Sequence, residues 1–173
     1  DQGTMWFTLP SGQRFELVTS VHDPAIANPG DGAFHPFDAS EVQAAIRDLR
    51  FPLSGIEVEI YILPYPRRGQ MRSAAGPGLI LLSPGVQTLS REYQHAEVVH
   101  ELGHIVQYAL MPDSDVERWT AYRALRGIGD LSTYDASARH ENRPHEIFAE
   151  DFRVLFGGAP AVGWGSVDNA ALA

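Results

Sequence analysis

Two histidines and a glutamate occur within five residues, in the run His100-Glu101-Leu102-Gly103-His104. Apolar residues recur at helical spacing over residues 91–110, which predicts a single helix around the run. Because residues four apart share a helix face, the imidazoles of His100 and His104 can bind one metal ion. Glu101 lies one position further round, where its carboxylate can take a proton from a water molecule on that ion. The run therefore predicts a zinc site that carries its own general base.

The alternative interpretation is that these three residues meet by chance on a solvated helix face. Against it, the residues around them are strongly apolar, so we expect the helix to be buried. Two imidazoles and a carboxylate are costly in a core without a partner such as a metal ion. The apolar neighbours are Val98, Val99, Leu102, Ile105 and Val106.

A catalytic zinc ion usually takes three protein ligands and keeps its fourth position for water. The longer metzincin motif does not supply the third ligand, because Gln107 and Leu110 stand where that motif has glycine and histidine. The sequence therefore has to provide the third ligand elsewhere.

A second helix is predicted over residues 144–156, with proline at its start and glycine after its end. Glu146 and Glu150 are four apart and share one face of it. We expect Glu146 to be the third zinc ligand and Glu150 to accept the spare ring N–H of a zinc-bound histidine. The alternatives are that both are ordinary exposed acids, or that the ligand is His145, which points about 100° away from Glu146.

The two predicted helices together resemble the gluzincin metallopeptidases of the anthrax lethal factor and Pro-Pro endopeptidase type. The second motif stands here as Glu146-Ile147-Phe148-Ala149-Glu150-Asp151-Phe152, with Ile147 in place of an aromatic residue. The resemblance covers roughly residues 75–158. It implies a zincin-like fold, zinc as the cofactor, Glu146 as a ligand and cleavage of peptide or protein substrates.

The same resemblance implies a tyrosine, ahead of the second helix, that hydrogen-bonds the tetrahedral intermediate. The segment Leu131-Ser132-Thr133-Tyr134 is similar to the family's segment, although a few additional residues near 136–140 separate it from Glu146. Peptide hydrolysis needs a donor for the oxyanion besides the metal. Tyr134 and His140 are the candidates in this segment, and we expect Tyr134 to be the donor, with His140 as the alternative.

We expect an α+β fold with a small mixed sheet. Residues 56–63 alternate between apolar and polar and predict a strand, and residues 78–83 predict a second. The zincin fold implied by the resemblance has an edge strand above the active-site helix, where an extended peptide can pair. We assign that edge to Leu79, Ile80, Leu81 and Leu82; the alternative is an interior strand without substrate contact.

The remaining segments support one domain. Residues 1–37 are predicted as a hairpin and loop extension, residues 38–158 as the catalytic domain and residues 159–173 as a loose tail rich in glycine and alanine. Helices are predicted over residues 38–50 and 113–126, the latter with Val116, Trp119 and Leu125 facing inward. A second metal site in the first loop matches no known spacing; its candidate ligands are His22, Asp23, His35 and Asp38.

The amino-acid composition limits which partners the protein can have and which side chains can bind a metal ion. The 173 residues are 44% hydrophobic, enough for a core, and no segment reaches transmembrane length. The net charge of −9 argues against a nucleic-acid partner and allows a basic peptide. Because the chain has no cysteine, disulfides and thiolate ligands are excluded. The resemblance implies secretion; a native start at Met5 would instead favour the cytoplasm, and the oligomeric state is open.

The sequence as a whole thus predicts a zinc-dependent endopeptidase. Two alternatives stay open: a zinc hydrolase that acts on a non-peptide amide, and a binding or toxin-like module that keeps the metal without turnover.

Overall fold

The structure is a computed structural model that describes residues 4–130 and 132–165, and it is α+β. The strands are β1 (Met5–Thr8), β2 (Arg14–Leu17), β3 (Glu59–Ile62), β4 (Ala74–Gly76) and β5 (Leu79–Leu82). The helices are α1 (Ala39–Arg47), α2 (Arg91–Leu110), α3 (Val116–Leu125), α4 (Pro144–Phe156) and α5 (Ala159–Gly163), with a short 3₁₀ turn, η1 (His140–Asn142), before α4.

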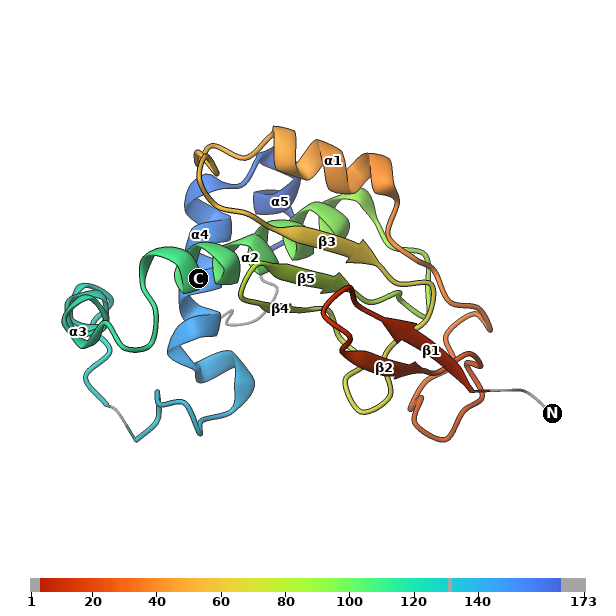
Figure 1. Cartoon of the computed structure of the whole chain (residues 1–173). Helices are drawn as coiled ribbons and strands as arrows, with labels where there is room; N and C mark the ends of the chain where they lie inside the picture. The colour runs from red at the N-terminus through yellow and green to blue at the C-terminus, as the bar shows by residue number, and fades with distance from the viewer. Residues whose placement is uncertain (1–3, 131, 166–173) are drawn as a thin grey trace.

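The main sheet has three strands in the order β3-β5-β4 (Figure 1). Strand β5 pairs in parallel with β3 and antiparallel with β4, so it is the central strand. The prediction that residues 79–82 form the edge was therefore wrong, and β4 is the edge strand. Sequence did not indicate β4 because it consists of alanine and glycine, which strands generally disfavour.

The two faces of this sheet are covered differently. Ile80 and Leu82 point into the main core, which they share with residues of α1, α2 and α4. Leu81, on the opposite face, packs with Leu9 and Leu63 beneath the β1–β2 hairpin. The alternation of the strands thus places helices on one side of the sheet and the hairpin on the other (Figure 1).

Helix α2 is the centre of the fold, and α1, α4, α5 and strand β4 all pack against it. It begins after Ser90, whose side chain accepts a hydrogen bond from the backbone N–H of Tyr93, and it ends before Pro112. Every residue from Gln94 to Gln107 is buried. The predicted bounds and burial of this helix are confirmed.

Helices α2 and α4 touch at Gly103, inside the histidine run. A Cβ atom at this position would lie 2.8 Å from the Cα of Ala149 and 3.1 Å from the Cβ of Phe152. Both neighbours belong to α4, whose first residue is Pro144 and whose end is marked by Gly157. Glycine at position 103 therefore lets the backbones of the two helices approach closely.

Two predictions about the periphery were wrong. In α3 only Trp119 is buried, whereas Val116 and Leu125 are 71% and 85% exposed. The reason is that α3 lies apart from the sheet and the other helices (Figure 1) and contacts α4 through Trp119 and Phe148. Residues 159–163, expected in a loose tail, form α5, which packs on α2 through buried Ala161. The rest of that tail, residues 166–173, lies outside the described residues.

Within the described residues, no helix combines the length and apolar character needed to cross a membrane.

The contact at Gly103 can be tested with Gly103→Ala. The added methyl group has no space against α4, so we expect the free energy of unfolding to fall by about 1–3 kcal/mol, measured by urea denaturation. The matched control is Gly163→Ala in α5, where an added Cβ meets no atom within 4 Å. Equal stability of Gly103→Ala and the unchanged protein would contradict the close packing of the two helices.

Candidate metal centre

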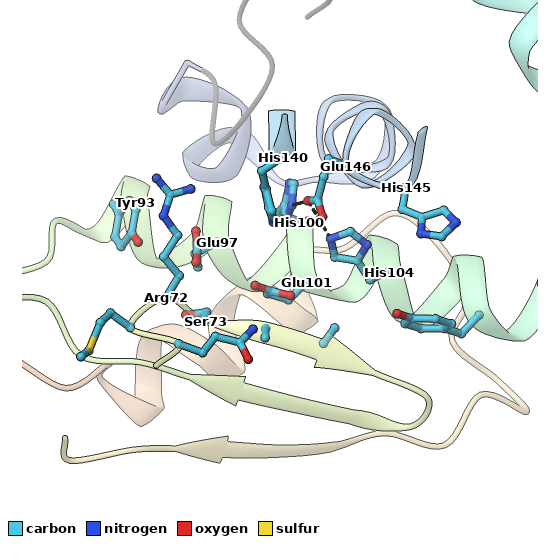
Figure 2. Close-up of a pocket in the computed structure, with 15 residues that line it drawn as sticks. Arg72, Ser73, Tyr93, Glu97, His100, Glu101, His104, His140, His145 and Glu146 are labelled. Atoms are coloured by element: carbon cyan, nitrogen blue, oxygen red, sulfur yellow. Dashed lines mark hydrogen bonds and ion pairs between the residues drawn. The ribbon is translucent and has the colours of Figure 1, made fainter. Parts of the chain in front are cut away.

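Two helices bring His100, His104 and Glu146 together in a buried group. One potential ligand atom from each residue lies within 4.8 Å of the others, and the three side chains form a set that can hold a metal ion. The Nε2 atoms of His100 and His104 lie 3.2 Å and 3.1 Å from the same carboxylate oxygen, Oε2 of Glu146. Figure 2 shows both imidazoles on α2 turned toward the carboxylate on α4.

The chemistry of this group fits a metal ion. It offers two imidazole nitrogens and a carboxylate oxygen, the donor types that divalent transition metals prefer in proteins without thiolate ligands. Each histidine presents Nε2 to the common point, and His100 keeps its other nitrogen, Nδ1, for a second carboxylate 3.3 Å away on Glu150. A metal-binding histidine commonly has such a partner, which fixes the ring and its tautomer.

Glu150 is itself held by Arg153, one turn further along α4. Arg153 donates from Nε to Oε2 of Glu150 over 3.0 Å and from Nη2 to Oε1 over 2.6 Å. Both side chains are buried, with Arg153 at 0% exposure. Sequence analysis identified Glu150 but missed Arg153. The sequence feature that could have indicated Arg153 is its position three residues after Glu150 on the same predicted helix, where the two side chains can pair.

The charges in this group are strongly coupled. Burial lowers the pKa of His100, but hydrogen bonds with Glu146 and Glu150 outweigh it, and the pKa is raised to about 10. The pKa of His104 is lowered by burial. Burial raises the pKa of Glu146, but hydrogen bonds with His100 and His104 outweigh burial and hold this pKa well below its usual range. Burial likewise raises the pKa of Glu150, but hydrogen bonds with His100 and Arg153 outweigh it and lower the pKa to about 2. Both carboxylates are therefore ionised at neutral pH, as a metal ligand and its partner must be.

The group opens into a cavity of about 580 Å³ between α2 and the edge of the sheet. The α2 wall includes Glu101, which points away from Glu146 toward the β4 side (Figure 2). The opposite wall comes from residues 70–75, which include the first two residues of β4 and the segment before it. The remaining lining residues are Tyr93, Glu97, His100, His104, Tyr108, His140, His145 and Glu146.

A buried arginine holds the sheet-side wall in place. Arg67 donates from Nη1 to the side chain of Gln70 and from Nη2 to the backbone carbonyl of Arg72, each over 3.2 Å. The hydroxyl of Ser83, just after β5, donates to the same carbonyl over 3.1 Å. The burial of Arg67 depends on tertiary packing, since its backbone forms a bridge with Leu17 of β2.

The segment before α4 contributes His140, whose Nε2 lies 3.2 Å from Oε1 of Glu146. Of the two candidate oxyanion donors, His140 therefore reaches the cavity, whereas Tyr134 is not among the residues that line it. Leu131, which precedes Tyr134 in the same segment, lies outside the described residues.

Two weaker candidates are not part of the metal group. His145 lines the cavity but directs its Nε2 toward Asp113, 2.9 Å away, and not toward the histidines of α2. In the first loop His35 contacts Asp31, and no further cluster of possible metal ligands is found there or elsewhere in the described parts of the chain.

Comparison of the chain with protein-family models, with curated proteins and with solved structures gives no match. What the site can do is therefore argued from its own residues.

Metal binding is tested by Glu146→Gln, which keeps the size of the side chain but removes its charge. We expect the unchanged protein to bind one zinc ion per chain and the variant to bind it at least about 10–100-fold more weakly, because it loses a direct ligand rather than an outer partner. Competition with a chromophoric chelator measures this affinity. Glu92→Gln, on the exposed first turn of α2, is the control, and equal zinc affinity in Glu146→Gln would remove Glu146 from the ligand set.

Proposed function

We propose that this protein is a zinc-dependent endopeptidase of the gluzincin type, with a zincin-like fold. One observation carries the proposal: a buried group of two histidines and a glutamate opens into a cavity that is also lined by Glu101. The resemblance to the metallopeptidases of the lethal factor and Pro-Pro endopeptidase type supports the same conclusion, and secretion is proposed from that resemblance alone.

The ligand set favours a catalytic over a structural metal site. Structural zinc sites are closed by four protein ligands, whereas catalytic sites use three. In the described part of the chain the group has three members, and His140 is not one of them, although it contacts Glu146. When bound, a zinc ion would make a water molecule more acidic and polarise the carbonyl of the scissile bond.

Glu101 is the proposed general base. It lies one residue after His100, is almost completely buried and faces the cavity (Figure 2). From this position its carboxylate takes a proton from the attacking water and delivers it to the departing amine. A carboxylate that faces the cavity from one wall can serve both transfers, because the attacked carbon and the leaving nitrogen are only one bond apart.

His140 is the proposed donor to the oxyanion, in place of Tyr134. It lies across from the β4 side of the cavity and contacts Glu146 (Figure 2), and with substrate bound its Nε2–H would turn from Glu146 to the oxyanion. Its contact with Glu146 orients the ring, which is otherwise carried by a solvent-exposed turn.

The peptide is proposed to lie along β4 instead of β5. In the described residues β4 pairs only with β5, and Ala74 and Ala75 of β4 line the cavity. An extended substrate can add to such an edge through backbone hydrogen bonds, and small side chains leave room for it. The net charge of −9 is compatible with a basic peptide.

The proposed base is tested with Glu101→Gln and a mixed peptide library. We expect cleavage by the unchanged protein and a fall in kcat of about 100- to 10,000-fold in the variant, with zinc affinity retained. Glu92→Gln, on the same helix but away from the cavity, should cleave normally. Library cleavage that survives in Glu101→Gln would reject the assignment of the base.

The library also separates the proposal from two other functions. The cavity volume of about 580 Å³ also suits a compact non-peptide amide, since small-molecule sites commonly have this size. A protein that binds a metal ion without catalysing a reaction is the other function, because His140 contacts Glu146 and could close the site to substrate. Zinc binding without cleavage of any peptide would favour one of these two functions over the endopeptidase.

The oxyanion donor is tested by comparing His140→Ala with Tyr134→Phe. We expect His140→Ala to lower kcat by about 100- to 1,000-fold, the usual effect of losing one oxyanion donor, and Tyr134→Phe to stay near the unchanged protein. Zinc affinity is measured for both, since His140 also contacts Glu146. The reverse order of the two effects would return the role to Tyr134.

A further inference from the structure

Arg153 is the largest side chain in the described residues that is fully buried, and it is charged. Glu150 contacts both the guanidinium of Arg153 and the ring of His100, and neither Glu150 nor Arg153 is among the residues that line the cavity. Arg153 makes two hydrogen bonds to the carboxylate of Glu150 and donates to the backbone carbonyls of Ala161 and Gly165. Arg153 thus connects the partner of a metal-binding histidine with the segment that contains α5.

Stability alone does not explain this arrangement. Moving a carboxylate and a guanidinium into a core carries a desolvation cost that their attraction barely offsets, and apolar residues of similar size often serve as well. One of the backbone carbonyls that Arg153 contacts belongs to Ala161, a residue of the main apolar core. Apolar residues at positions 150 and 153 would suit such a core. We therefore look for a role of the Glu150–Arg153 ion pair in the metal centre.

The geometry around Glu150 indicates that role. Its Oε2 atom faces both Nε of Arg153, at 3.0 Å, and Nδ1 of His100, at 3.3 Å, while Oε1 is held by Nη2 of Arg153 at 2.6 Å. A planar guanidinium that binds both oxygens fixes the plane of the carboxylate. It thereby fixes the direction from which Oε2 meets the imidazole, and hence the orientation of Nε2 toward Glu146.

We propose that Arg153 is a positioning residue of the metal centre: it aligns Glu150, which in turn aligns His100 for metal binding. The inference rests on the metal-binding part of the proposed function and does not depend on which bond the protein cleaves. It makes the segment from α5 to Gly165 a structural support of the site, because the backbone carbonyls of this segment hold the other side of the guanidinium.

The test is a cycle of zinc affinities for Arg153→Met, Glu150→Met and the double variant. We expect each single variant to bind zinc about 10–100-fold more weakly, as is usual for loss of an outer partner of a ligand. If Arg153 acts through Glu150, the double variant should bind zinc with the same affinity as Glu150→Met alone. Arg126→Met is the matched control, because Arg126 also pairs with a carboxylate of α4, that of Asp151 at 2.8 Å.

Arg153→Met leaves a buried carboxylate unpaired and can fail to fold. The double variant removes both charges, so we expect it to unfold at a urea concentration no lower than the unchanged protein while its zinc affinity is reduced. Arg153→Lys keeps the charge but not the two-pronged contact, and its zinc affinity should lie between those of the unchanged protein and Arg153→Met.

Each outcome has a distinct meaning. Unchanged zinc affinity in Arg153→Met, or losses that add in the double variant, would overturn the positioning role. Reduced stability of the double variant with normal zinc binding would make the pair a packing element only. Failure of the unchanged protein to bind zinc would instead reject the proposed function itself.

Discussion

The structure depends on the close approach of α2 and α4 at Gly103. Because this residue has no side chain, the backbone of Ala149 comes within van der Waals contact of α2, and Glu146 lies one turn earlier on the same helix. The carboxylate is thereby brought within hydrogen-bonding distance of both histidines. A metal group built on two packed helices is more rigid than one built on loops, since the core on both sides fixes the backbone.

Burial then gives the group its chemical character. Isolated imidazoles and carboxylates are costly in a core, so each of these groups has a partner: His100 meets two carboxylates, and Glu150 meets Arg153. The result is a chain of polar contacts that runs from the cavity through α2 and α4 to α5. Glu101 lines the cavity at one end of this series of contacts, and Arg153 is buried in the core at the other end.

The walls of the cavity other than α2 are built from less regular structure. A short edge strand of alanine and glycine, held by the buried Arg67 and by Ser83, forms one wall of the cavity. The 3₁₀ turn before α4 brings His140 to the other side. In the proposed peptidase, the helices would hold the reacting groups, whereas the loop and the edge strand would meet the substrate.

Sequence alone determined the two helices, the pairing of His100 with His104 and the candidate roles of Glu146 and Glu150, because helical periodicity fixes which residues share a face. It also determined β5 as an apolar strand, but not its place in the sheet, since strand order depends on pairing with the weakly patterned β4. Tertiary structure decided what sequence spacing cannot: that α4 meets α2 at Gly103, that His140 rather than Tyr134 lines the cavity, and that Arg153 is buried behind Glu150. Each of these is a contact between segments distant in the chain or a consequence of burial, and local periodicity carries no information about either.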